Sequence, residues 1–254
     1  MKNLFDLTGK VAVITGSTRG IGRSIAEHMA QAGAKVVISS RTAEDCEAVA
    51  QAIRNEGGQA MAIPASISKF PELQALVQKT RDTWGKIDIL VCNAASNPFF
   101  GSMMNLPDEI FDKTMRNNIL SNLWLSKLVA PEMMARKDGV IIIVSSIAGL
   151  RGTPMLGVYA LSKAADLQLV RNLALEFGKS NVRVNCIAPG LIKTDFAKAL
   201  WENPDLRAQR EAATPLGRIG DPEDIAGIAV MLAGPAGAFI TGQTIVADGG
   251  VTIA

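Results

Sequence analysis

Seven short runs of apolar residues recur along the chain, separated by longer stretches in which apolar and polar residues alternate with a helical period. The runs lie at residues 10–15, 35–39, 59–63, 87–91, 139–144, 182–187 and 243–247. They are apolar almost throughout, which is typical of strands buried on both faces of a parallel sheet. The amphipathic stretches predict helices near 20–32, 42–56, 69–84, 107–134, 158–178 and 222–233. This alternation predicts a single α/β domain over residues 1–254, with a doubly wound, mostly parallel seven-stranded sheet and helices on both faces.

One segment, residues 190–222, interrupts the alternation between the sixth strand and the last helix. A connection of that length in a compact domain is more often a lid or a binding loop than a plain link. Because it mixes Phe196, Leu200 and Trp201 with charged residues, we expect a short helical cover over a substrate site. A plain surface excursion is the alternative.

Composition and charge exclude several classes of function. The formal net charge of +2 is too small to indicate a nucleic-acid or anionic-membrane partner. Cys46, Cys92 and Cys186 are far apart and form no CxxC pair, which favours reduced thiols over a disulfide framework or a zinc site. No apolar stretch approaches the ~18 residues that span a bilayer, and the N-terminus lacks a signal-peptide pattern. We therefore expect a soluble, cytoplasmic protein.

The single histidine, His28, lies in the first predicted helix, next to Glu27. A Ser–His–Asp hydrolase would need that histidine beside a nucleophilic serine, and the chain has no GxSxG motif. With one histidine and scattered cysteines, the sequence predicts no metal site.

A glycine-rich turn joins the first strand to the first helix. The stretch "TGSTRGIG" places Gly16, Gly20 and Gly22 at this turn, together with Ser17, Arg19 and Ile21. Glycine is needed where the chain turns sharply and where backbone must approach a phosphate closely. The helix N-terminus then offers free N–H groups to a diphosphate. In this position the turn indicates a dinucleotide site.

The end of the second strand indicates which dinucleotide is preferred. An NAD site usually places Asp or Glu there to bind the ribose 2′-hydroxyl, but this chain has Ser39, Ser40 and Arg41. Arg41, with Arg19 opposite it, can clamp a 2′-phosphate through charge-assisted hydrogen bonds. We therefore expect NADP(H) to be preferred over NAD(H). The alternative is that both arginines are solvated surface charges.

The only tyrosine of the chain, Tyr159, stands four residues before Lys163. On a helix these positions share one face, so the lysine ammonium can approach the phenol and favour its ionised form. Such a phenol can act as a general acid and base. Ser146 stands thirteen residues earlier, at the end of the fifth strand. A tyrosine packed in the core is the alternative for Tyr159.

Seven motifs in order along the chain resemble those of the short-chain dehydrogenase/reductase superfamily. They are "TGSTRGIG", "VCNAAS", "NN" at 117–118, "VSSIAG", "YALSK", "VRVNCIAPGLIKT" and "VADGG". The resemblance covers nearly the whole chain and is greatest to the NADP-dependent carbonyl and retinal reductases of the peroxisomal type. It implies the Rossmann form of the doubly wound sheet, a homotetramer, and catalysis by Asn118, Ser146, Tyr159 and Lys163. Asn118 would shape a helix and anchor a water that serves Lys163, whereas its neighbour Asn117 is expected at the surface.

The resemblance also implies the other cofactor contacts. Lys163 would bind the nicotinamide ribose, next to Tyr159. Further contacts are expected from Ser66, Ile67, Asn93, Ala94, Ala95, Pro189, Gly190, Ile192 and Thr194. Two positions depart from the family pattern, since Ala95 replaces the glycine of the usual "NNAG" and Ser66 replaces the usual Asp.

The expected substrate wall is mostly apolar, as small-molecule pockets tend to be. Its candidates are Asn97, Phe99, Leu156, Phe196 and Trp201, with Ser96, Pro98, Phe100, Ile147 and Leu200 nearby. The predicted function is hydride transfer between NADP(H) and a ketone, an aldehyde or a secondary alcohol, with Tyr159 as general acid and base. A 3-oxoacyl-[acyl-carrier-protein] reductase is one alternative, and a non-catalytic NADP(H)-sensing regulator is another.

Overall fold

The computed structural model describes residues 3–254. All seven predicted strands form one parallel sheet in the order β3-β2-β1-β4-β5-β6-β7. The strands are β1 Val11–Thr15, β2 Lys35–Ser39, β3 Gln59–Ala62, β4 Ile89–Cys92, β5 Gly139–Val144, β6 Val182–Pro189 and β7 Thr244–Ala247. The chain order reverses direction between β1 and β4, as in a doubly wound Rossmann sheet.

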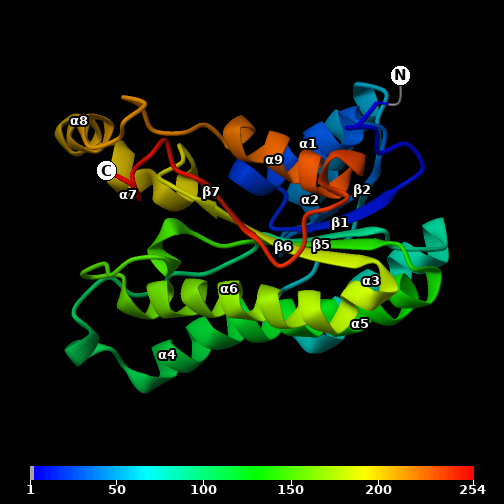
Figure 1. The fold of residues 1–254 in the computed structure, drawn as a ribbon, viewed down its shortest axis with the longest axis horizontal. Helices are drawn as coiled ribbons and strands as arrows, with labels where there is room; N and C mark the ends of the chain where they lie inside the picture. Colours follow the sequence, from blue (N-terminus) through cyan, green and yellow to red (C-terminus); the bar gives the residue numbers. More distant parts are fainter. Residues whose placement is uncertain (1–2) are drawn as a thin grey trace.

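Helices cover both faces of the sheet (Figure 1). They are α1 Gly20–Gln31, α2 Ala43–Asn55, α3 Phe70–Trp84, α4 Asp108–Met115, α5 Ser121–Arg136, α6 Gly157–Phe177, α7 Lys198–Trp201, α8 Pro204–Ala212 and α9 Pro222–Ala233. Short 3-10 turns are η1 Met103–Asn105, η3 Ile147–Gly149, η4 Gly178–Ser180, η5 Asp195–Ala197 and η6 Pro235–Gly237. The helices α1, α2 and α9 pack on one face, and α3, α5 and α6 pack on the other.

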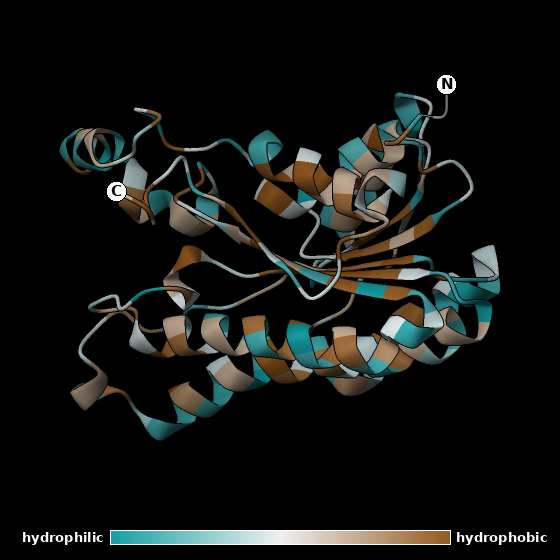
Figure 2. Ribbon diagram, in the orientation of Figure 1, coloured by the Kyte–Doolittle hydropathy of each residue, from teal (hydrophilic) through white to brown (hydrophobic). Residues whose placement is uncertain are grey.

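The core has two halves because successive strand residues point to opposite faces. In β1, Ala12 and Ile14 join the α1, α2 and α9 half, whereas Val13 joins the other half. Both sets are fully buried, so β1 is apolar without alternation, as expected for the centre of a parallel sheet. Figure 2 shows this hydrophobic sheet between two helical layers whose outer faces are more hydrophilic.

The helix expected near 107–134 is not continuous. A five-residue π-turn, η2 (Arg116–Leu120), separates α4 from α5. Such an expanded turn inside a helix is rare and occurs frequently at functional sites. The break is caused by hydrogen bonds between the π-turn and the loop after β4.

The segment at 190–222 forms a cover whose two ends are joined. Ile192 pairs with Gly220 as an isolated parallel bridge, and the Lys193 amide donates to the Gly220 carbonyl at 2.8 Å. Between them lie η5, α7 and α8, which project beyond the sheet near the C-terminus (Figure 1). The Arg218 guanidinium binds both carboxylate oxygens of Asp224 in α9, at 2.6 and 2.8 Å. The cover is therefore a closed loop fastened to the body of the domain.

Candidate active site

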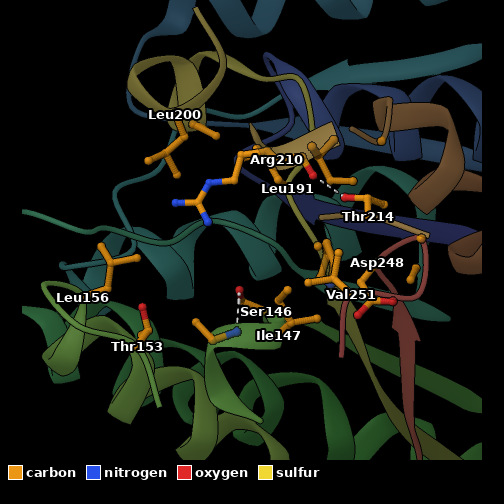
Figure 3. A pocket seen from close by; sticks show the side chains of 18 of the residues that line it. Ser146, Ile147, Thr153, Leu156, Leu191, Leu200, Arg210, Thr214, Asp248 and Val251 are labelled. Carbon is orange, nitrogen blue, oxygen red and sulfur yellow. Dashed lines mark hydrogen bonds between the residues drawn. The ribbon is translucent and has the colours of Figure 1, made fainter. Parts of the chain in front are cut away.

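A cavity of about 1080 Å³ lies at the carboxyl ends of the central strands and is lined by Ser146, Tyr159 and three of the five predicted substrate residues. Ser146 reaches the cavity from the end of β5, Pro189 from β6 and Tyr159 from α6. The cover contributes Phe196 and Leu200 to the lining. Figure 3 shows Leu200 across the cavity from Ser146. Carboxyl ends of parallel strands lie at one edge, so the sheet order itself brings these distant segments together.

The glycine turn forms a cradle at the start of α1. Gly16 and Gly20 have φ values of +65° and +53°, in the left-handed region that favours glycine. A Cβ at Gly22 would collide with the Gly16 carbonyl oxygen, so only glycine permits this close packing of α1 on the turn. No side chain of residues 3–254 caps the N-terminus of α1. Its N–H groups are therefore available to a diphosphate, and the cradle fits a dinucleotide.

Two predicted cofactor residues hold this turn in place. The Ser17 hydroxyl is buried and accepts a hydrogen bond from the Ser39 amide at 2.9 Å, which ties the turn to β2. The Asn93 side-chain amide donates to the carbonyl oxygens of Thr15 and Gly16, at 3.0 and 3.1 Å. Their side chains shape the cradle from β2 and from the end of β4.

Arg19 and Arg41 stand exposed beside the cradle. Arg19 is the first residue before α1, and its guanidinium lies 4.0 Å from the Asp195 carboxylate. Arg41 follows β2 and forms no ion pair with any residue of the described chain. Its neighbour Ser40 is half-buried, and its amide donates to the Cys46 sulfur at 3.1 Å. Arg41 is therefore an unpaired cation, Arg19 is loosely paired with Asp195, and no acid stands at the end of β2.

The remaining predicted cofactor residues follow the ends of β3, β4 and β6 along the same edge. They are Ser66, Ile67, Ala94, Ala95, Pro189, Gly190, Ile192 and Thr194. Ile21, Pro189, Gly190, Ile192 and Thr194 also line the cavity, so the catalytic groups and the cradle open into one space.

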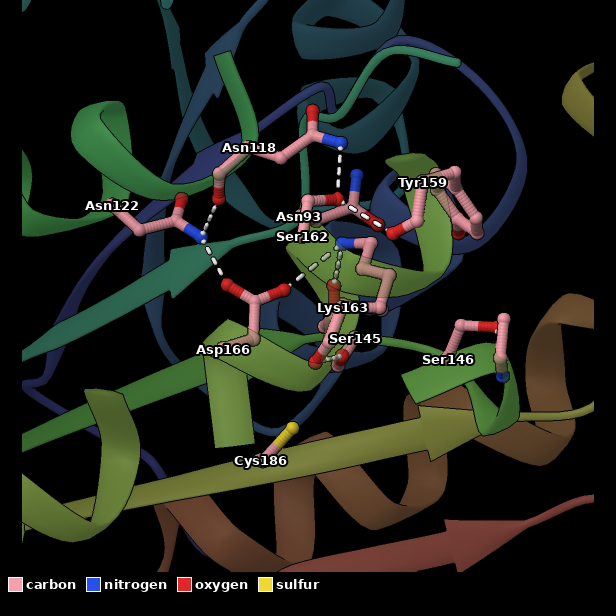
Figure 4. A network of polar contacts seen from close by, with 12 residues as sticks. Asn93, Asn118, Asn122, Ser145, Ser146, Tyr159, Ser162, Lys163, Asp166 and Cys186 are labelled. Carbon is pink, nitrogen blue, oxygen red and sulfur yellow. Dashed lines mark hydrogen bonds and ion pairs between the residues drawn. The ribbon is translucent and has the colours of Figure 1, made fainter. Parts of the chain in front are cut away.

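Ser146 and Tyr159 both line the cavity. The Ser146 hydroxyl accepts a hydrogen bond from the Ala148 amide at 3.1 Å, at the start of η3. Tyr159 lies in the first turn of α6, half-buried, with its ring centre 6.1 Å from that of Phe196. Figure 4 shows Tyr159 and Ser146 to the right of the buried Lys163.

Lys163 is 1% exposed and belongs to a polar network inside the protein. Its Nζ donates to the Val144 carbonyl at 3.0 Å, lies 3.2 Å from the Asp166 carboxylate and is 5.7 Å from the Tyr159 ring centre. Burial alone would lower the pKa of Lys163, but the negative charge of Asp166, with Tyr159, raises it above the usual value. Lys163 therefore remains an ammonium ion at neutral pH.

Asn118 is fully buried in the π-turn. Its side chain accepts from the Ser96 amide at 2.8 Å and donates to the Ser96 carbonyl at 2.9 Å and the Ser162 hydroxyl at 2.9 Å. The expectation that Asn117 lies at the surface is wrong, because it is also buried and donates to the Ser96 hydroxyl at 3.0 Å. Both side chains bind the loop after β4, and this tertiary pairing accounts for the break between α4 and α5.

Two residues of the network, Asp166 and Asn122, were not predicted from the sequence. The Asn122 side-chain amide donates to the Asp166 carboxylate at 3.0 Å and to the Asn118 carbonyl at 2.7 Å (Figure 4). A continuous path of polar contacts therefore joins Lys163 to the π-turn. The available signal was an acidic residue on the face of α6 that also carries Lys163, among apolar neighbours.

Three of the five predicted substrate residues line the cavity, namely Asn97, Leu156 and Phe196. The Asn97 side-chain oxygen is buried without a hydrogen-bond partner in the described residues. Phe99 and Trp201, which were also expected in the substrate wall, do not line the cavity. The Phe99 ring packs over Gly101, and the Trp201 indole N–H donates to the Thr194 carbonyl at 2.9 Å, so both support the wall from behind.

No helix within residues 3–254 is long and apolar enough to cross a membrane. No group of three His, Cys, Asp or Glu side chains in that range is placed to hold a metal ion. The three cysteines are buried and unpaired, and His28 is half-buried with Nδ1 2.8 Å from the Ser24 carbonyl.

Comparison with known proteins agrees with this geometry. Residues 16–252 match the family model described as enoyl-(acyl carrier protein) reductase. Bovine (Bos taurus) dehydrogenase/reductase SDR family member 4 is 44% identical over 244 residues, which is 96% of this chain and 88% of that protein. A 7α-hydroxysteroid dehydrogenase, solved with NADH and 7-oxo glycochenodeoxycholic acid, has a TM-score of 0.94 and 40% identity, covering 98% of each chain.

A gluconate 5-dehydrogenase from Burkholderia cenocepacia J2315, solved with NADP and tartrate, also has a TM-score of 0.94. It is 31% identical, and the match covers 99% of this chain and 98% of that one. The fold and the site thus define a nicotinamide-dependent oxidoreductase of the Rossmann type. The chain belongs to the short-chain dehydrogenase/reductase superfamily.

Proposed function

We propose that the protein is an NADP(H)-dependent carbonyl reductase that also works in reverse as an alcohol dehydrogenase. The observation that carries the proposal is that Ser146 and Tyr159 line one cavity beside the glycine cradle, with the buried ammonium of Lys163 5.7 Å from the Tyr159 ring centre. The similarity to dehydrogenase/reductase SDR family member 4 supports the same reaction class.

Each catalytic side chain has a distinct role in carbonyl reduction. The Ser146 hydroxyl donates to the substrate oxygen and fixes its position. The Tyr159 hydroxyl gives its proton to that oxygen, and the Lys163 ammonium stabilises the phenolate that remains. The nicotinamide ring, when bound, supplies the hydride in reduction and accepts it in oxidation.

The residues beside the cradle support a preference for NADP(H). A carboxylate at the end of β2 would repel a 2′-phosphate, whereas this chain places Arg41 there and Arg19 opposite. The relatives do not decide the matter, since one was solved with NADH and another with NADP. The tightness of NADPH binding therefore depends on these two arginines.

A homotetramer in the cytoplasm is part of the proposal. On α6, Leu161 and Leu175 are 47% and 83% exposed, and Val246 on β7, an edge strand of the sheet, is 41% exposed. Apolar side chains gathered on one helix and a free edge favour burial against a second copy. Light scattering should give about four times the chain mass of 26.9 kDa, and Leu175→Arg should lower it. An unchanged mass in that variant would contradict assembly through α6.

The test of function is cofactor oxidation with NADPH and NADH side by side, against aromatic ketones, diketones, aldehydes and a 3-oxoacyl thioester. We expect turnover of free carbonyl compounds with NADPH. Arg41→Ala should lower NADPH affinity at least about tenfold and leave NADH affinity unchanged, with Arg171→Ala on α6 as the control. Turnover of the thioester alone would favour the acyl-carrier alternative. Binding of NADPH without turnover of any carbonyl would favour a sensor.

A further inference from the structure

One arginine of the cover, Arg210 in α8, points into the substrate cavity. It lines the cavity together with Ser146 and Leu156, and Figure 3 shows its guanidinium directed from α8 toward the space between them. Three arginines lie in this part of the cover, and they differ in their partners. Arg207 pairs with Glu211 at 2.8 Å, and Arg218 pairs with Asp224 at 2.6 Å. Arg210 has no acidic partner in the described chain.

A second unpaired arginine lines the same cavity from the opposite side. Arg151 follows η3, is exposed and forms no ion pair within residues 3–254. The acidic side chains of the cavity wall are engaged elsewhere. Asp224 is held by Arg218, and Asp248 accepts from the amides of Gly250 and Thr252 at 2.9 and 2.8 Å. Both acidic side chains of the cavity wall are therefore engaged, whereas the Arg210 and Arg151 guanidinium groups are not.

We propose that the carbonyl substrate carries an anionic oxygen group, a carboxylate or a phosphate, which Arg210 binds with help from Arg151. The inference rests on the proposed carbonyl reduction, because it assigns the substrate class of the same site. A guanidinium presents two parallel N–H donors that match a carboxylate or a phosphate. The ion pair would also stabilise α8 over the cavity once substrate is bound, because the anion then bridges the cover and the body of the domain.

The apolar wall and the charged group serve different parts of one substrate. Leu156, Phe196 and Leu200 surround the hydrocarbon portion, and Ser146 and Tyr159 hold the reacting oxygen. Arg210 then selects among compounds that share this reacting portion. A neutral substrate would displace water from the Arg210 guanidinium without giving it a charged partner. The site should therefore discriminate against neutral analogues.

Two readouts separate this inference from the proposed reaction. Binding is measured by calorimetry with the protein saturated by NADP⁺, which cannot reduce a ketone. The probes are 4-acetylbenzoate, its methyl ester, 4-acetylphenyl phosphate, and further keto acids with their esters. Turnover of the same probes with NADPH reports the reaction separately.

In the binding arm, we expect the acids to bind at least about tenfold more tightly than their esters. Arg210→Ala should remove that difference and leave ester and NADPH binding unchanged, whereas the matched variant Arg207→Ala on the same helix should behave as wild type. The carboxylate and phosphate probes show which anion is preferred. The inference is wrong if no anionic probe binds more tightly than its neutral analogue. It is also wrong if Arg210→Ala and Arg207→Ala weaken the binding of the anionic probes equally. Tight, Arg210-dependent binding without turnover would instead overturn the proposed reaction alone.

Discussion

At the scale of single residues, the unusual feature is a fully buried ion pair beside Tyr159. Lys163 and Asp166 are at most 1% exposed and lie 3.2 Å apart. Their remaining hydrogen bonds go to the Val144 carbonyl and the Asn122 amide. Taking one partner away leaves a charge in the interior without compensation, which costs more than the pair itself contributes.

Asp166→Leu should therefore lower the free energy of unfolding by about 3–5 kcal/mol, the usual cost of breaking a buried pair. Asp166→Asn keeps the shape and the hydrogen bond to Asn122, so its loss should be smaller. Turnover should fall in both variants because Lys163 is held less firmly beside Tyr159. Denaturant unfolding and initial rates measure the two effects, and a leucine variant as stable as wild type would contradict this role.

The sequence predicted Ser146, Tyr159 and Lys163 because their spacing is local and their chemistry is distinctive. It did not predict the partnership of Asp166 with Asn122, which lie 44 residues apart on separate helices. Pairings of that kind depend on the packing of α5 against α6 and leave no periodic pattern in the chain.

At the scale of elements, the strands were predicted to within two residues because each is a short, mostly apolar run. The cover was expected as an insertion, and its residues Phe196, Leu200 and Arg210 line the cavity. Its fastening to α9 was not foreseen. The Arg218 hydrogen bonds hold the pKa of Asp224 below its usual value, so the carboxylate stays charged and paired throughout the neutral range.

Arg218→Gln should loosen the cover without unfolding the domain. We expect faster amide hydrogen exchange across residues 198–212 in the variant at pH 5 to 7, relative to wild type at the same pH. A carboxyl group whose pKa is depressed in the folded state contributes stability that is fully present above its unfolded-state pKa of about 4 and is lost as the pH falls through the lower folded-state pKa. The difference in exchange between the variant and wild type should therefore shrink as the pH is lowered below about 4. Arg171→Gln on α6 is the control. Equal exchange in wild type and Arg218→Gln at neutral pH would show that the pair does not hold the cover.

At the scale of the whole molecule, an apolar core fills the space between each face of the sheet and its layer of helices. All three cysteines lie in these cores. Cys46, Cys92 and Cys186 are all buried. Burial, followed by the charge of Asp166, raises the pKa of Cys186 to about 12, and the same causes raise the pKa of Cys92. The thiols of Cys92 and Cys186 are therefore neutral and shielded in the folded state.

We therefore expect that no cysteine of the native protein reacts with an aromatic disulfide reagent at pH 8 within minutes. All three thiols should react once the protein is unfolded in guanidinium chloride. The absorbance of the released thiolate counts the accessible cysteines directly. Rapid reaction of even one thiol in the native state would contradict the burial described for these positions.

Replacing Tyr159 by Phe tests the proposed chemistry most directly, because it removes the hydroxyl and little else. That hydroxyl makes no hydrogen bond within residues 3–254, so the fold should be unaffected. We expect NADPH to bind Tyr159→Phe as it binds wild type, while carbonyl reduction falls at least about a hundredfold through loss of the general acid. The measurement is NADPH affinity and initial rate on the same preparation. Retained turnover in the phenylalanine variant would remove Tyr159 from the reaction.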